Sequence, residues 1–160
     1  RGLYASACAF YKQWYASSIA GVMQKDFDNW NEMKKEINDD PVPRVFFHPR
    51  EIWFAYLGAN IGFEQDGRGE EFLRPMLIVR KFNNDICWAL PLTRAVKPSN
   101  PYYATFSYSP FPDEETPMLS SAAILSQLRL IDGKRLRYKI GTIPAGEFDM
   151  LKKKVRQLLA

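Results

Sequence analysis

Hydrophobic positions along the chain follow two different periods, which predict helices at both ends and strands between them. Between residues 24 and 37, large apolar side chains recur every three to four residues, as on one face of an amphipathic helix. These residues are Phe27, Trp30, Met33 and Ile37. After the proline-rich break at residues 41–43, short runs of aromatic and β-branched residues replace this spacing, and such runs are typical of strands.

The predicted strands are short and separated by turn signals. They cover residues 45–47, 51–57, 74–80, 86–92, 102–108, 122–125 followed by 126–131, and 140–143. Residues 83–85, Asn-Asn-Asp, favour a hairpin between two of these strands. A final helix is expected from about residue 145 to 159, with Phe148, Leu151 and Val155 on one face. This order predicts a mainly β protein with flanking helices: a small, half-open antiparallel barrel with a C-terminal helix packed on it.

Composition fits one folded domain. The chain has 160 residues, of which 46% are hydrophobic and 25% charged. We assign residues 1–40 to an N-terminal helical extension and residues 44–160 to the domain itself. Residues 1–22, which precede Met23, are interpreted either as part of this extension or as a remnant of upstream sequence.

Charge is distributed unevenly along the chain. The net charge is +4, yet residues 23–40 carry three lysines against six acids. Residues 129–156 carry nine basic side chains against three acidic ones, which favours a polyanionic partner.

Cysteine and histidine usage argues against a metal centre. The two cysteines, Cys8 and Cys87, form no Cys-x-x-Cys pair, and His48 is the single histidine. We therefore expect no metal and no cofactor, and a buried, reduced Cys87. No run approaches the roughly 18 apolar residues of a membrane span, so we expect a cytoplasmic protein.

Four short motifs then follow one another in a specific order. Gly62 to Gly67 reads Gly-Phe-Glu-Gln-Asp-Gly, and Arg74-Pro75 leads into a predicted strand. Pro91-Leu92-Thr93 ends the next strand, and Gln127 to Asp132 reads Gln-Leu-Arg-Leu-Ile-Asp. In content and order these motifs resemble the MazF/PemK-like toxins, over about residues 49–159.

The resemblance implies a fold and an activity. The fold would be an SH3-like barrel, related to that of a DNA gyrase poison and usually found as a homodimer. The protein would be a type II toxin-antitoxin endoribonuclease that cuts single-stranded RNA, mainly mRNA, at a short sequence. The cut would use no metal, would proceed by attack of the 2′-hydroxyl, and would inhibit translation. Its protein partner would be a cognate antitoxin.

The motif residues suit this chemistry. Attack by a ribose 2′-hydroxyl builds negative charge on the phosphate oxygens, and a fixed guanidinium stabilises such charge. Arg74 is the candidate for that role, and Thr93, at the end of the partner strand, for a hydroxyl donor to the phosphate. Glu64 is the candidate base for the 2′-hydroxyl proton.

A second set of residues is expected to bind the RNA. Single strands are bound by cations that follow the phosphates and by aromatic rings that stack on bases. The candidates are Phe63, Gln65, Arg94, Lys97 and Gln127. Gln127 is equally compatible with a buried, hydrogen-bonding position in the sheet.

One departure from the family pattern leaves alternatives open. Six residues separate Gly67 from Arg74 where the family pattern has one, which makes Arg68 a second candidate for the phosphate contact. Two other functions also fit the fold: a gyrase poison that acts by binding protein, and a non-catalytic RNA- or protein-binding module.

Overall fold

Seven strands form the centre of the molecule, and a helix lies at each end of the described chain. The computed structural model describes residues 25–42, 45–95, 99–110 and 118–159. The strands are β1 (Glu51–Tyr56), β2 (Leu73–Lys81), β3 (Ile86–Thr93), β4 (Tyr103–Pro110), β5 (Leu119–Ile124), β6 (Arg129–Asp132) and β7 (Leu136–Thr142). The helices are α2 (Phe27–Asp39), α3 (Ala145–Leu158) and the single-turn η1 (Leu125–Gln127) and η2 (Gly133–Arg135). The predicted mainly β architecture with flanking helices is confirmed.

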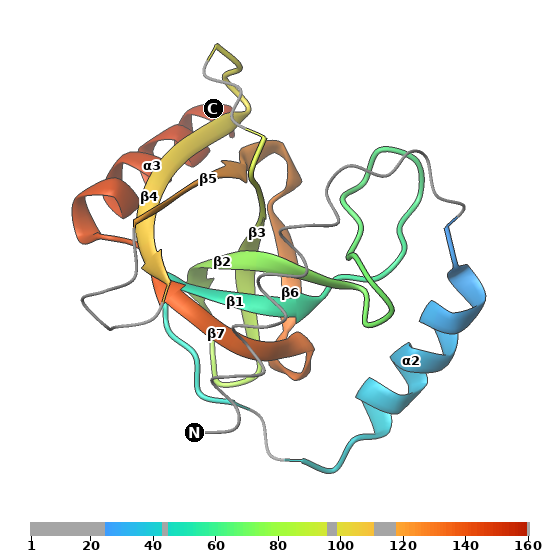
Figure 1. Ribbon diagram of the computed structural model, residues 1–160. Coiled ribbons are helices and arrows are strands. Elements are labelled where there is room, and N and C mark those ends of the chain that lie inside the picture. Colours follow the sequence, from blue (N-terminus) through green and yellow to red (C-terminus); the bar gives the residue numbers. More distant parts are fainter. Residues whose placement is uncertain (1–24, 43–44, 96–98, 111–117, 160) are drawn as a thin grey trace.

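The sheet curls into a barrel. All strand pairs are antiparallel, in the order β2-β1-β7-β4-β5-β3-β6, and β2 also pairs with β3. This additional pairing closes six strands into a ring, with β6 attached to β3 (Figure 1). The helices α2 and α3 lie on opposite sides of the barrel (Figure 1).

Successive side chains of a strand point to opposite faces of the sheet, and a hydrophobic cluster lies on each face. Ile52, Phe54 and Leu77 belong to one cluster, which the predicted face of α3 covers with Phe148, Leu151 and Val155. Trp53, Met76 and Ile78, which alternate with them, belong to the second cluster, together with Cys87. Cys87 is fully buried and free, as expected, and burial raises the pKa of its thiol to about 12.

A side chain caps the start of the helix α2, and one face of the helix packs on the barrel. The Asp26 side chain caps its start by accepting a hydrogen bond from Asn29 N at 3.0 Å. Trp30 is buried with Ala59 and Phe72 in a third apolar cluster, and Met33 and Ile37 pack against it. The predicted stripe is thus correct from Trp30 onward, whereas Phe27 is 48% exposed. Within the described residues, no helix is long and apolar enough to cross a membrane.

One predicted strand is wrong, and another begins later than expected. Residues 45–47 form no strand: Phe47 inserts fully into the core and Val45 packs against the same cluster, while Phe46 is 80% exposed. Their apolar character therefore reflects packing on the core without strand pairing. Residues 125–127 form η1, and β6 begins only at Arg129. Gln127 therefore lies outside the sheet, in a turn that faces the loop between β1 and β2.

Candidate functional site

The loop between β1 and β2 holds the first motif and closes on itself. Its central part, residues 58–67, is called the Glu64 loop below. Gly67 N donates to Gly58 O at 2.7 Å across the neck of the loop. A Cβ atom on Gly67 would lie 1.7 Å from Phe72 O, so no other residue fits this close approach.

Side-chain bonds fix the interior of the Glu64 loop. Asn60 N donates to Asp66 Oδ1 at 2.6 Å, and Asn60 Nδ2 donates to Leu57 O and Gln65 O at 3.2 and 2.8 Å. The loop is therefore a folded unit that presents its side chains in set directions.

The five extra residues fold as a small hairpin at the end of this loop. Arg68 and Leu73 exchange main-chain hydrogen bonds of 2.8 and 3.0 Å. Gly69 and Phe72 turn the chain with φ angles of +68° and +49°. The Phe72 side chain is buried against Trp30 of α2, with ring centroids 5.5 Å apart. The insertion thus extends the loop without displacing Arg74 from the start of β2.

Arg74 lies at the base of the Glu64 loop and is 5% exposed. Its Nε donates to Asp66 O and its Nη1 to Leu92 O at 2.9 Å, so the guanidinium joins the loop to the end of β3. Burial, together with the nearby charge of Arg68, lowers the pKa of Arg74 to about 10, and the charge of Asp66 opposes this shift. The side chain stays cationic at neutral pH.

Thr93 lies at the same end of the β2–β3 hairpin. Met76 pairs with Pro91, and Arg74 and Thr93 each lie two residues beyond that pair on their own strands. Because side chains alternate along a strand, both project from the same face. Thr93 is partly exposed, and its hydroxyl accepts a hydrogen bond from Ala95 N at 3.2 Å.

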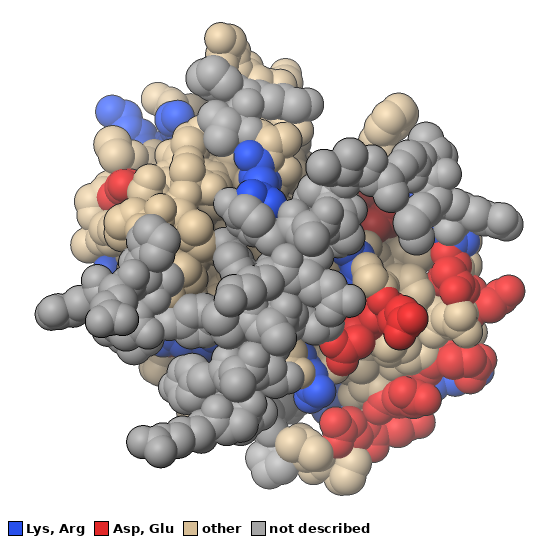
Figure 2. Space-filling model, viewed as in Figure 1, with Lys and Arg blue, Asp and Glu red and all other residues tan. Residues whose placement is uncertain are grey.

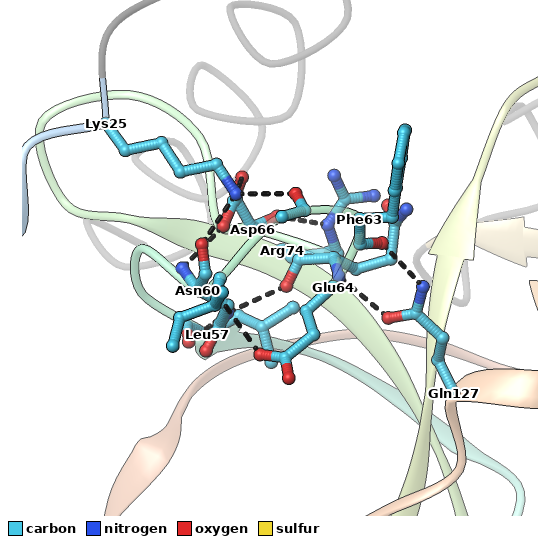
Figure 3. Close-up of polar contacts among 11 residues, drawn as sticks. Lys25, Leu57, Asn60, Phe63, Glu64, Asp66, Arg74 and Gln127 are labelled. Atoms are coloured by element: carbon cyan, nitrogen blue, oxygen red, sulfur yellow. Dashed lines mark hydrogen bonds and ion pairs between the residues drawn. The ribbon is translucent and has the colours of Figure 1, made fainter.

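Glu64 and Phe63 point in different directions (Figure 3). The Phe63 ring is fully exposed and lies on the same side of the loop as the Arg74 guanidinium. The Glu64 carboxylate turns to the opposite side, where it accepts a hydrogen bond of 3.4 Å from Ile61 N. The structure thus places Arg74 and Thr93 at the same end of the β2–β3 hairpin and directs the Glu64 carboxylate away from the Arg74 guanidinium.

The Gln127 side chain binds main-chain atoms of the Glu64 loop. Its Oε1 accepts from Gln65 N at 2.7 Å and its Nε2 donates to Phe63 O at 3.1 Å (Figure 3). Both amide functions are used within the protein, so Gln127 orders the loop that carries three of the other candidates. Gln65 and Arg94 are partly exposed, and Lys97 lies outside the described residues.

One contact with the loop could not be expected from the motifs. Lys25, which precedes α2, donates from Nζ to Asn60 O and Gly62 O at 2.6 and 2.9 Å. It also forms an ion pair with Asp66 Oδ2 at 3.0 Å (Figure 3). No sequence signal marks this residue, because two of its three partners are main-chain oxygens.

Comparison with known proteins identifies the domain. A family model described as a PemK-like, MazF-like toxin of type II toxin-antitoxin systems matches residues 48–159. This match spans the barrel and α3 and leaves α2 outside. No curated protein matches the chain.

Several solved structures are similar to this chain. The toxin MazF-mt6 of Mycobacterium tuberculosis is 16% identical, with a TM-score of 0.49, over 69% of this chain and 96% of that one. MazF of Deinococcus radiodurans is 21% identical, with a TM-score of 0.48, over 75% and 98%. A MazE-MazF complex from Deinococcus radiodurans matches at 17% identity and a TM-score of 0.42, over 76% and 98%.

Proposed function

Because residues 48–159 match the PemK-like, MazF-like toxins and the chain belongs to that family, we propose that it is an endoribonuclease toxin of a type II toxin-antitoxin system. Its substrate is single-stranded RNA, mainly mRNA, cut at a short sequence without a metal so that translation stops. The observation that carries the proposal is the cationic Arg74 beside Thr93 at the end of the β2–β3 hairpin, bonded to the loop that presents the exposed ring of Phe63.

The proposed reaction is an attack within the RNA itself. The 2′-oxygen of one ribose forms a bond to the adjacent phosphorus, and the bond from phosphorus to the 5′-oxygen of the next nucleotide breaks. A 2′,3′-cyclic phosphate and a 5′-hydroxyl result. The 2′-hydroxyl proton passes to a base, and the leaving 5′-oxygen takes a proton from water.

Arg74 stabilises the charge that develops on the phosphate. Its Nε and Nη1 already bond main-chain oxygens, which fixes the guanidinium before the substrate arrives and leaves Nη2 for a phosphate oxygen. The Thr93 hydroxyl supplies a second donor from the facing strand. A preorganised cation of this kind contributes roughly 10²–10³ in rate.

Glu64 takes the role of the base. Its carboxylate bonds Ile61 N in this structure, so it must rotate about its side-chain torsions to reach a 2′-hydroxyl beside Arg74. Phe63 stacks on a base, Arg94 and Lys97 contact phosphates, and Gln65 contacts RNA at the loop. Gln127 contributes by holding the main chain of Phe63 and Gln65.

The proposed partners follow from the family. A second copy of the chain forms a homodimer, and a cognate antitoxin binds the toxin and blocks its RNA groove. The place of action is the cytoplasm, where mRNA is available. Residues 44–160 are the toxin domain, and residues 1–40 are an extension of it.

An RNA with one altered sugar tests the proposed chemistry. The purified protein is incubated with a long single-stranded RNA in EDTA, and the cut sites are mapped by primer extension. A short RNA containing one such site is then compared with the same RNA carrying 2′-deoxyribose at the cut nucleotide. We expect cutting of the first and none of the second. Cleavage of both would contradict 2′-hydroxyl attack; cleavage of neither by folded protein would favour a gyrase poison or a binding module.

A further inference from the structure

The segment before α2 reaches into the Glu64 loop through one lysine. Lys25 Nζ lies 2.6 Å from Asn60 O, 2.9 Å from Gly62 O and 3.0 Å from the Asp66 carboxylate. An ammonium group has three hydrogens, and here each has an acceptor. The three acceptors lie on both arms of the loop, so Lys25 joins the arms on either side of Phe63 and Glu64.

The helix α2 fixes the position of this lysine. Trp30 is buried against Phe72, and a Cβ atom added to Gly58 would lie 2.0 Å from Trp30 Cε2. Gly58, with a φ of +86°, begins the Glu64 loop, and Phe72 ends the hairpin that follows it. Trp30 therefore packs on both ends of the β1–β2 connection.

Two additions to the family pattern thus pack on one another. Phe72 belongs to the longer loop, and Trp30 belongs to α2, which lies outside the family match. The Arg135 guanidinium lies over the Trp30 ring, 5.6 Å from its centroid, and donates to Tyr56 O at 2.8 Å. The contact joins the extension to the barrel at the point where β1 enters the loop.

The outer face of α2 is unsuited to contact with RNA. Acidic side chains gather over this helix in Figure 2, and its exposed acids include Asp28, Glu32, Glu36 and Asp39. Such a face repels a phosphate backbone. A role of the extension in the RNA site must therefore act through the loop that it holds.

We propose that Lys25 is a positioning residue of the ribonuclease site: through its three contacts it holds the Glu64 loop, which carries Phe63 and Glu64, in the folded conformation that Arg74 also contacts through Asp66 O. This inference rests on the proposed function. Three side chains hold the loop: Gln127 and Arg74 from the barrel, and Lys25 from the extension. The extension then contributes to the site by positioning the Glu64 loop, and Lys25 affects the reaction without contacting the RNA.

The test compares three lysine variants of the whole 160-residue chain. Lys25→Met removes the three contacts with the loop. Lys35→Met is the control, because it removes only an exposed ion pair with Glu32 within α2. Lys25→Arg keeps the charge and is the rescue variant. Hydrogen exchange of the amides in residues 58–67 and single-turnover cleavage of RNA are measured for each protein at a temperature where all are folded.

We expect amide exchange in the loop of Lys25→Met to accelerate roughly tenfold or more. We also expect its cleavage rate at saturating RNA to fall roughly ten- to a hundredfold, with KM little changed, because a misplaced loop slows the reacting step. Lys35→Met should match the wild-type protein, and Lys25→Arg should recover most of the rate. A lysine that merely stabilised the fold would lower the unfolding temperature and leave the rate of the folded protein unchanged.

Amide exchange and RNA cleavage distinguish a failure of the proposed function from a failure of the role proposed for Lys25. A wild-type protein that cuts no RNA contradicts the proposed function, and loop exchange still shows whether Lys25 holds the loop. Unchanged exchange in Lys25→Met overturns the anchoring itself. Faster exchange with an unchanged cleavage rate overturns the positioning role while leaving the nuclease intact.

Discussion

The guanidinium of Arg74 bonds the main-chain oxygen of Leu92 at 2.9 Å, and this contact ties the start of β2 to the residue before Thr93. The same side chain also bonds Asp66 O in the Glu64 loop. One buried arginine thus connects the loop, β2 and the end of β3. Its structural and proposed chemical roles are linked, because the bonds that hold it also fix its remaining donors.

Replacing Arg74 with lysine should affect both roles. A single ammonium cannot bond both carbonyls with the geometry of the guanidinium fork, so one buried acceptor loses its partner, at a cost of about 1–3 kcal/mol in the free energy of unfolding. We expect RNA cleavage to fall by roughly 10²–10³. Arg80→Lys, at an exposed position on the same strand, is the control and should leave both quantities near wild type. Near wild-type cleavage by folded Arg74→Lys would contradict the role proposed for this residue.

Two substitutions of Gln127, which remove one or both of its hydrogen bonds to the Glu64 loop, test its role in holding the loop. Gln127→Glu keeps an acceptor for Gln65 N and loses the donor to Phe63 O, while Gln127→Ala loses both. Each lost bond should cost about 1 kcal/mol in the free energy of unfolding. Cleavage rates should therefore fall in the order wild type, Gln127→Glu, Gln127→Ala, with Ser126→Ala unchanged. Equal rates in all four proteins would exclude a role of this anchor in the reaction.

Two glycines should respond in opposite directions to alanine. A methyl group on Gly67 would overlap Phe72 O, so Gly67→Ala should lower the free energy of unfolding by about 3 kcal/mol or more and displace the Glu64 loop. Gly146, in α3, has open space at its Cβ position, and alanine there should add up to about 1 kcal/mol because it favours the helix. Denaturant unfolding measures both. A tolerated alanine at position 67 would show that the loop neck is looser than described.

Stability should depend on pH through Glu51. Burial raises the pKa of this carboxyl, but hydrogen bonds from Lys139 Nζ, Trp53 Nε1 and His48 N outweigh that effect, so its pKa is lowered from 4.5. The stabilisation is therefore present above about pH 4.5 and is lost as pH falls through the lowered pKa, because the unfolded state binds the proton first.

Glu51→Gln isolates this contribution. We expect the variant to be less stable than wild type by about 1–3 kcal/mol at pH 7, with the difference shrinking as pH falls below about 4.5. Urea unfolding at several pH values measures it. Glu32→Gln, in an exposed pair with Lys35, is the control and should have little effect at any pH. A difference for Glu51→Gln that is constant with pH would show that its charge is not the source of the stability.

Sequence patterns predicted those helices and strands that have local signals in the sequence. They did not predict the contacts that side chains make with main-chain atoms of the loop. The Asn83–Asp85 turn and the flanking apolar runs predicted the β2–β3 hairpin that the structure contains. Residues 45–47 were misleading because Val45 and Phe47 pack on the core without pairing as a strand. Lys25 carries no signal at all, since its partners are the oxygens of a folded loop, and the use of both amide functions of Gln127 within the protein could be seen only in three dimensions.

The most direct test of the proposed function is cleavage of a long single-stranded RNA in EDTA by the wild-type protein and by Arg74→Lys, side by side, with both proteins shown to be folded. We predict discrete cuts at one short sequence for the wild type, with 5′-hydroxyl ends, and almost none for the variant. Absence of cutting by the wild type, or equal cutting by both proteins, would contradict an endoribonuclease built around Arg74.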